Sequence, residues 1–258
     1  MNLRKLIIVL LVALALTAAG IQYSLFALEK VPHVLAPLST LLGFLIALFH
    51  ASQRMGWGRA AGMLAATFSV SLTFESLGVA TGAIYGPYHY SDKLGFLFLG
   101  LVPLIIPAAW FMMTYPSFVI ADWIIPAGAA WRRAQVAAIG AAVMTAWDLV
   151  MDPIMVRAGH WVWEIQGAYF GIPVHNFLGW WLTTFISFGV FLLLGKPALP
   201  WRDDPQFDRF AVILFALIAT MHISNAFLGG LGGPALAGLF AIFPWLFFAW
   251  TQMKRYMK

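Results

Sequence analysis

The sequence contains no cysteine, and only 10 of its 258 residues are acidic. Without cysteine the chain can form no disulfide, no thiolate nucleophile and no cysteine-ligated metal site. Charged residues of both signs make up 10% of the chain, whereas a soluble domain contains about 25%. Hydrophobic residues make up 62%, and the mean hydropathy is +0.86. These values exclude an ordinary soluble domain and predict a polytopic membrane protein.

Long apolar runs occupy most of the chain. A run of about 17–25 residues is long enough to cross a bilayer as a helix, and the sequence contains eight such candidates. We expect an all-α fold, a polytopic transmembrane helix bundle that forms a single integral membrane domain over residues 1–258. The expected spans are Leu3–Leu28, Val34–Ala51, Ala60–Val79, Leu94–Ile120, Ala134–Met151, His175–Gly195, Phe210–Leu228 and Pro234–Gln252. Met1–Gly20 also fits a cleaved signal peptide, and its removal would leave the other spans oriented as before.

The positive charges predict which side each loop faces, because Lys and Arg concentrate on the cytoplasmic side of membrane proteins. If the N-terminus is cytoplasmic, only Lys30, Lys93 and Arg157 of the 15 Lys and Arg residues lie outside. The twelve inner residues are Arg4, Lys5, Arg54, Arg59, Arg132, Arg133, Lys196, Arg202, Arg209, Lys254, Arg255 and Lys258. We therefore expect both termini to be cytoplasmic. The net charge of +5 follows from this topology, so no nucleic-acid partner is expected.

Acidic residues inside the apolar runs are the strongest functional signal, since an ionisable group at membrane depth is costly and usually has a function. Glu75 lies in the third expected span, and Asp148 and Asp152 lie four residues apart around the end of the fifth. Residues four apart share a helix face, and two carboxyls so placed repel, so one of them should hold a proton. Such a pair is suited to general acid catalysis, and we favour Asp148 as the proton donor.

Polar residues from four expected spans should lie at one depth. Counted from the cytoplasmic start of their helices at ~1.5 Å per residue, the candidates lie ~20–28 Å along, in the outer third of a core ~30 Å thick. The sixth span begins at the same level. The residues concerned are Glu75, Asp148, Asp152, His175, Asn176, His222 and Asn225. The outer loops Ala80–Lys93 and Pro153–Val174 should cover them, which predicts one polar pocket near the non-cytoplasmic face.

The carboxyl candidates also have structural interpretations. Asp152 could cap a helix that ends before Pro153, or it could pair with Arg157. Glu75 could form a hydrogen bond to a neighbouring helix. Asn176 could be the N-cap of the sixth span, or it could orient a water molecule or a carboxyl. The sequence leaves these alternatives open.

Each remaining polar or aromatic candidate has a structural interpretation beside the functional one. His222 and Asn225 could join helices by hydrogen bonds. Trp161 and Trp163 could belong to an interfacial aromatic belt or could line the pocket. A metal site is not expected, because the candidate ligands show no His or carboxylate spacing on one helix. Those candidate ligands are Asp152, His160, Glu164 and His175.

A pocket of carboxyls and aromatic rings, without thiols or nucleotide motifs, is suited to acid–base chemistry on a lipophilic substrate such as an alkene. A protonated carboxyl donates a proton, aromatic faces stabilise the carbocation, and a second polar group directs water onto it. The same pattern also fits a transporter or proton-coupled carrier of a lipophilic compound, a non-catalytic scaffold, or an isomerase that forms the same cation. Clustering near one face, rather than at the midplane, counts against transport.

Three stretches carry a more specific signal: FESLGVATGAIYGPYHYSDKLG (Phe74–Gly95), PLIIPAAWFMM (Pro103–Met113) and the Asp-x-x-x-Asp-Pro and Trp-x-Trp motifs within Thr145–Thr183. These stretches resemble the membrane carotenoid-biosynthesis family, which includes the CruF-type carotenoid 1,2-hydratases and the bisanhydrobacterioruberin hydratases. The resemblance spans about residues 60–195 and is weaker in the last two spans.

The resemblance implies cofactor-independent addition of water to the terminal C-1,2 double bond of an acyclic carotenoid ψ-end, which gives a tertiary hydroxyl. It implies a lipophilic carotenoid substrate, water and the lipid bilayer as partners, beside other carotenoid-synthesis enzymes in a bacterial or archaeal cell membrane. No cofactor is expected. The positions that match the family's motifs are Glu75, Tyr85, Tyr88, Trp110, Asp148, Asp152, Trp161, Trp163 and Asn176.

Overall fold

The computed structural model describes residues 2–28, 31–32, 34–194 and 203–257. Within these ranges its main elements are eight α-helices, each long and apolar enough to cross a membrane. The prediction of an all-α polytopic bundle is therefore confirmed. The helices are α1 (Leu3–Tyr23), α2 (Leu35–Met55), α3 (Trp57–Thr81), α4 (Ile105–Ile124), α5 (Arg132–Arg157), α6 (Val174–Leu194), α7 (Pro205–Leu228) and α8 (Gly232–Arg255).

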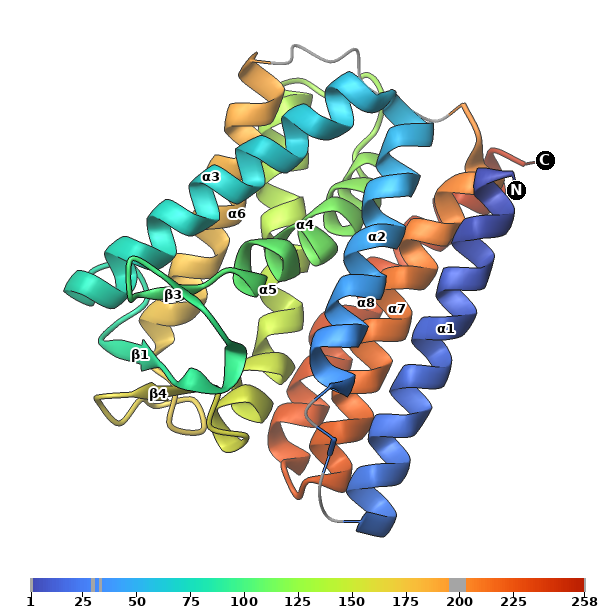
Figure 1. The fold of residues 1–258 in the computed structure, drawn as a ribbon. Coiled ribbons are helices and arrows are strands. Elements are labelled where there is room, and N and C mark those ends of the chain that lie inside the picture. Colours follow the sequence, from blue (N-terminus) through green and yellow to red (C-terminus); the bar gives the residue numbers. More distant parts are fainter. Residues whose placement is uncertain (1, 29–30, 33, 195–202, 258) are drawn as a thin grey trace.

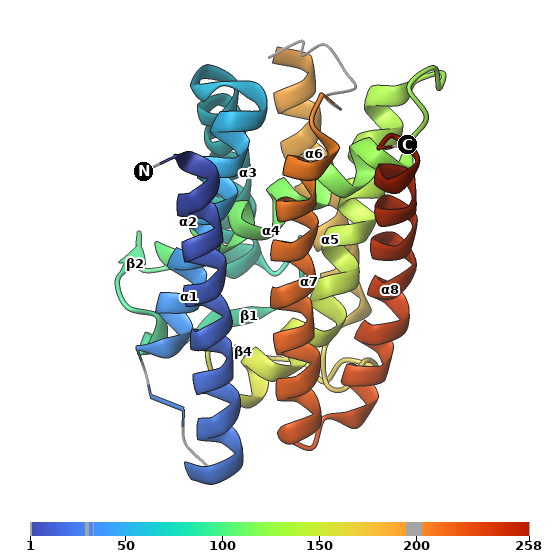
Figure 2. The same cartoon turned by 90° about the vertical axis from the view of Figure 1, so that its right-hand side faces the viewer.

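The helices form two groups with α4 between them (Figure 1). One group contains α1, α2, α7 and α8, and Figure 2 shows α1, α7 and α8 along one side of the molecule. The other group contains α3, α5 and α6, and α4 contacts helices of both groups. Every residue of α4 from Trp110 to Trp123 is buried, as expected of a helix at the centre of a bundle. It is also the most enclosed span, with 78% of its apolar window buried.

The two ends of the bundle differ in charge. Helix α1 begins and α8 ends at one end, here called the terminal end, as an even number of passes requires (Figure 1). The described Lys and Arg residues lie toward this end, except Lys93 and Arg157 at the opposite end. Which end faces the cytoplasm stays a prediction. Four residues used for it lie outside the described residues: Lys30, Lys196, Arg202 and Lys258.

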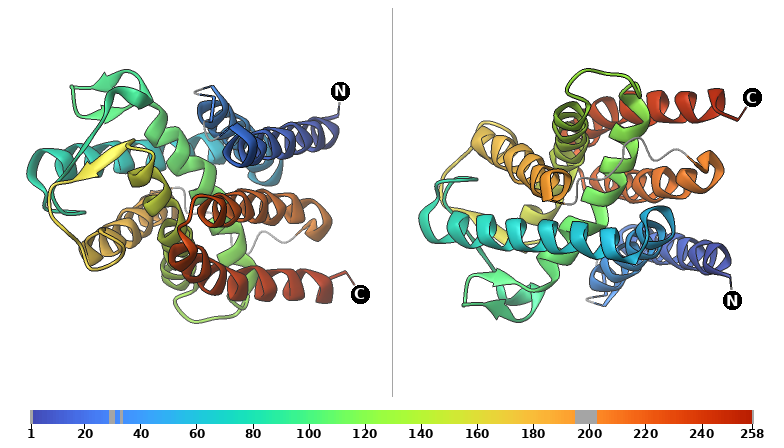
Figure 3. Two further views of the ribbon diagram at one scale, coloured as in Figure 1. Left: turned by 90° about the horizontal axis from the view of Figure 1, so that it is seen from below. Right: turned by 90° about the horizontal axis from the view of Figure 1, so that it is seen from above.

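Short strands join the two loops at the opposite end, here called the strand end, which the left view of Figure 3 faces. Strand β1 (Tyr88–Tyr90) pairs antiparallel with β4 (Trp161–Trp163). Tyr88 lies opposite Trp163, and Tyr90 lies opposite Trp161. A second hairpin pairs β2 (Leu97–Phe98) with β3 (Val102–Pro103). The loop after α3 and the loop after α5 are therefore held together as one layer.

The prediction that the fourth span begins at Leu94 is wrong. Helix α4 begins at Ile105, and the preceding apolar residues form the β2–β3 hairpin instead. Gly95 and Gly100 have φ of +83° and +70°, a conformation that suits glycine and turns the chain. The loop after α3 is therefore longer than expected and reaches the start of α4.

The predicted end of the fifth span is also wrong. Helix α5 continues through Pro153 to Arg157, so Asp152 lies inside the helix and does not cap it. The covering loop accordingly begins at Ala158 rather than at Pro153. The sixth helix begins at Val174, one residue earlier than expected, and the expected last residue of that span, Gly195, lies outside the described residues.

Candidate active site

A cavity of about 500 Å³ lies at the strand end of the bundle. Its wall includes residues from α3, α4, α5, α6 and α7 and from strands β1 and β4. Ten of the predicted site residues line it: Glu75, Tyr85, Tyr88, Trp110, Asp152, Trp161, Trp163, Asn176, His222 and Asn225. The structure thus brings together residues that lie up to 150 positions apart in the sequence.

Glu75 is held by three neutral donors. Its carboxyl is 4% exposed, and Tyr88 and Tyr90 both donate a hydrogen bond to Oε2, the latter at 2.8 Å. Trp110 Nε1 donates to Oε1 at 2.9 Å. The two tyrosines reach the same carboxyl because alternate residues of β1 face the same side. Burial is the main cause, and the charge of the nearby Glu75 the second, that raises the pKa of both tyrosines well above the usual range. Both phenols therefore stay protonated and act as hydrogen-bond donors.

The two aspartates share one amide. Asn176 Nδ2 donates to Asp148 Oδ2 at 2.9 Å and to Asp152 Oδ2 at 2.7 Å. Trp161 Nε1 donates to Asp152 Oδ1 at 2.7 Å. Both carboxyls are almost fully buried, with exposed fractions of 0% and 1%. Asn176 therefore orients carboxyls, which was one of the two roles left open by the sequence.

Asp148 lies behind the cavity wall, whereas the sequence interpretation placed it in the pocket. It does not line the cavity, and its Oδ1 is buried without a hydrogen-bond partner among the described residues. Asp152 does line the cavity. Within the described part of the chain no Lys or Arg forms an ion pair with Glu75, Asp148 or Asp152, so the suggested pairing of Asp152 with Arg157 is not found.

Aromatic rings form much of the cavity wall. Trp110 stacks on Trp180 with ring centroids 4.2 Å apart, and Tyr88 packs on Trp163 at 5.1 Å. Tyr90 meets Trp161 edge-on at 5.8 Å. Trp161 and Trp163 thus line the cavity from β4, which was one of their two predicted roles.

The ring of Tyr85 is clamped between two helices. A Cβ at Gly78 on α3 would lie 2.6 Å from the ring, and a Cβ at Gly179 on α6 would lie 2.5 Å from it. The Tyr85 hydroxyl and Thr183 Oγ1 are 2.8 Å apart and share a hydrogen bond. Glycine is therefore needed at both positions for α3 and α6 to approach the same ring.

His222 and Asn225 line the cavity from α7, whereas His175 does not line it. The side chain of His175 is exposed at the start of α6, so we do not retain it in the site. In the described part of the chain, no group of three or more His, Asp or Glu side chains could hold a metal ion.

The sequence interpretation missed Tyr90, Trp147 and Trp180 as cavity residues. Tyr90 could have been found, since it lies two positions after Tyr88 and a strand would place both on one face. Trp180 lies near the start of the sixth expected span, where an interfacial aromatic belt is the ordinary interpretation of a tryptophan. Trp147 immediately precedes Asp148, and nothing in the apolar run distinguishes it from an ordinary core residue.

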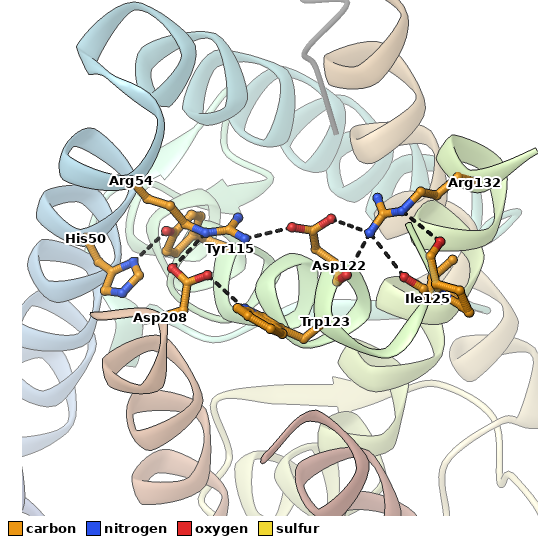
Figure 4. A network of polar contacts seen from close by, with 9 residues as sticks. His50, Arg54, Tyr115, Asp122, Trp123, Ile125, Arg132 and Asp208 are labelled. Carbon is orange, nitrogen blue, oxygen red and sulfur yellow. Dashed lines mark hydrogen bonds and ion pairs between the residues drawn. The ribbon is translucent and has the colours of Figure 1, made fainter. Parts of the chain in front are cut away.

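A second buried polar cluster, which was not predicted from the sequence, lies at the terminal end (Figure 4). Arg54 Nη2 lies 2.7 Å from Asp122 Oδ2, and Arg54 Nε lies 2.9 Å from Asp208 Oδ1. Arg132 Nη2 lies 2.7 Å from Asp122 Oδ1. Trp123 Nε1 donates to Asp208 Oδ2 at 2.8 Å. Both arginines had been interpreted only as charges on cytoplasmic loops.

Comparisons with known proteins show the family of the chain. A family model described as "Carotenoid biosynthesis protein" matches residues 35–244, which include every cavity carboxyl. The bisanhydrobacterioruberin hydratase of Haloarcula japonica is 33% identical over 126 residues, which are 48% of this chain and 42% of that relative. The match thus spans less than half the length of the curated relative. No solved structure matches. On the extent of the family match, the chain belongs to the carotenoid biosynthesis protein family.

Proposed function

We propose that the chain is a carotenoid hydratase that adds water to the C-1,2 double bond of an acyclic ψ-end, without a cofactor. One observation carries this proposal: two carboxyls with no cationic partner among the described residues line a cavity walled by indole and phenol rings, and a third, Asp148, shares an amide with one of them. Family membership and the hydratase name of the matched relative support it. We place the enzyme in a bacterial or archaeal cell membrane, with its site near the non-cytoplasmic face.

The reaction begins with proton transfer from the aspartate pair. The π electrons of the double bond form a new C–H bond at C-2, which leaves a tertiary cation at C-1. A water oxygen then forms a bond to C-1, and the extra proton leaves that oxygen for a carboxylate. The net change is the addition of one water molecule.

We assign the proton transfer to Asp152, with Asp148 as the partner that shares its proton. The sequence favoured Asp148, but Asp152 is the member of the pair that lines the cavity. Two carboxyls linked by one amide in a low-dielectric site favour a state with one shared proton. The pair therefore supplies an acid at the cavity wall.

We assign the opposite role to Glu75. Three donors on its two oxygens stabilise the carboxylate form, since hydrogen bonds to a charged group favour that form. A fixed carboxylate stabilises the cation and accepts the final proton, which returns to the aspartate pair before the next turnover. The faces of Trp110, Trp161 and Trp163 add cation–π stabilisation.

Expression in a lycopene-accumulating bacterium tests this function. The extracted pigments are separated by chromatography and analysed by mass spectrometry, and we expect a product heavier by about 18 Da, the mass of one water added by acid–base chemistry. Asp152→Asn and Glu75→Gln variants serve as controls. Unchanged lycopene, γ-carotene and longer acyclic carotenoids, with folded protein present, would contradict the hydratase function and favour transport or scaffolding.

A further inference from the structure

Two buried polar side chains at the cavity have no part in the carboxyl chemistry. His222 and Asn225 are 5% and 8% exposed, and both line the cavity from α7. They lie three residues apart, which places them on one face of the helix with Cβ atoms about 5–6 Å apart. Neither is an acid, so together they offer a neutral polar site beside the charged one.

The ring nitrogens of His222 have distinct roles. Nδ1 lies 2.8 Å from Ile218 O, a carbonyl that can only accept, so Nδ1 carries the hydrogen. Trp147 Nε1 lies farther from the same nitrogen, at 3.4 Å, and cannot donate to an atom that already holds a hydrogen. The Trp147 ring meets the imidazole edge-on at 5.4 Å and fixes its plane. Nε2 is therefore left as an acceptor for a group in the cavity.

Asn225 has unused hydrogen-bonding capacity. Its Oδ1 is buried with no hydrogen-bond partner among the described residues. Leaving a buried amide oxygen without a partner costs about 1–3 kcal/mol, and because that oxygen has almost no surface of its own, a ligand in the cavity reaches the Asn225 amide through Nδ2. The paired amide nitrogen is a donor, so the side chain can bond to a group that both donates and accepts.

The carboxyls themselves are poorly placed to hold a water molecule. Glu75 Oε2 already accepts from Tyr88 and Tyr90, and both oxygens of Asp152 accept hydrogen bonds from protein groups. A water molecule held by neutral partners also keeps a free lone pair for attack. A neutral site beside the carboxyls can hold the nucleophile, while the remaining lone pairs of the carboxyls stay available to accept its proton.

We propose that His222 and Asn225 bind the water molecule that captures the carbocation. This inference rests on the proposed hydratase function. The water donates one hydrogen to His222 Nε2 and forms a second hydrogen bond with the Asn225 amide, which leaves an oxygen lone pair directed at C-1. After the C–O bond forms, the extra proton passes to a cavity carboxylate, and the same two residues hold the new hydroxyl until the product leaves.

The fate of the cation in D2O tests this role. Capture by water gives the alcohol, whereas loss of a proton from C-2 or the adjacent methyl group returns a deuterium-labelled or shifted alkene. We expect Asn225→Leu and His222→Phe to lower the ratio of alcohol to labelled alkene at least 10-fold while labelling continues. His222→Gln, which keeps an acceptor, should restore part of the ratio. Met221→Leu alters the same wall without removing a polar group and should leave the ratio unchanged.

The other outcomes are distinct. If Asn225→Leu and His222→Phe are both folded and keep the wild-type ratio of alcohol to labelled alkene, these residues do not hold the water. If alcohol and labelled alkene fall together, or if only KM rises, the residues are structural or bind the substrate, and the proposal is wrong. If the wild-type protein gives neither alcohol nor labelled alkene, the hydratase function itself fails.

Discussion

The molecule contains two buried polar clusters whose acidic residues have different partners, cations in one and neutral donors in the other. In the cluster at the terminal end, Asp122 and Asp208 both pair with Arg54 at 2.7–2.9 Å, and Asp122 also pairs with Arg132. At the strand end, Glu75 and Asp152 receive hydrogen bonds from neutral donors beside a cavity. Compensated charges hold helices together, whereas an uncompensated carboxyl can exchange a proton with a substrate. The difference favours a structural role for the cluster at the terminal end and a catalytic role for the carboxyls at the strand end.

The sharpest test of this comparison is Asp152→Asn. The amide keeps the side-chain shape and removes the acid, so hydration should fall about 10²–10⁴-fold, the usual contribution of a general acid. Thermal stability in detergent should fall less than on loss of a buried ion pair, because the amide gives up only one of the two hydrogen bonds that Asp152 accepts. Product formation per folded protein is measured alongside the melting temperature. Wild-type activity would show that Asp152 is not the donor.

Arg54→Met should give the reverse result at the terminal end. Its loss leaves Asp122 and Asp208 without one of their cations, and breaking a buried pair typically costs about 3–5 kcal/mol. Activity per folded molecule should remain near that of the wild type. Stability is followed by thermal unfolding in detergent, with Arg54→Lys as an intermediate case. If Arg54→Met were folded and stable but inactive, the cluster at the terminal end would have a role in activity and the proposed difference between the clusters would be wrong.

Tyr88→Phe removes one donor from Glu75. A hydrogen bond to a charged group contributes about 1.5–3 kcal/mol, so the variant should lose roughly 10- to 100-fold in rate if the carboxylate is used in the transition state. Tyr90→Phe provides a second measurement on the same oxygen. Reaction rates and unfolding are compared, and a loss of stability alone would assign the tyrosines a structural role.

Gly179→Ala should have the smallest effect that can still be resolved. The added methyl group would lie 2.5 Å from Ile84 O and from the Tyr85 ring, and overpacking of this kind costs about 1–3 kcal/mol. Gly189→Ala is the matched control on the same helix, because nothing lies within 4 Å of its Cβ. Equal stability of the two variants would show that the Tyr85 clamp is not tight.

The sequence could predict that the candidate residues lie close together, because helix rise and topology determine how far each residue lies across the membrane. Glu75, Asp152, Asn176 and His222 line one cavity as that calculation indicated. The partners of the acids could not be predicted, since depth says nothing of which face of a helix meets which neighbour. For this reason the position of Asp148 behind the cavity wall was not foreseen.

The irregular parts of the fold also escaped prediction. Hydropathy cannot distinguish the apolar hairpin before α4 from another turn of helix, and Pro153 did not end α5 as its sequence position suggested. The ion-pair network was missed because Arg54 and Arg132 lie at helix ends, where basic residues usually reflect topology alone.

The pairing of β1 with β4 has a consequence for the order in which the protein is made. Strand β1 carries two donors to Glu75, but its partner strand is synthesised only after α4 and α5. A nascent chain that has inserted only four helices thus holds Glu75 and its tyrosines without the strand that aligns them. The candidate site is therefore completed late in synthesis, because Asn176 and His222 follow on α6 and α7 after β4 has been made.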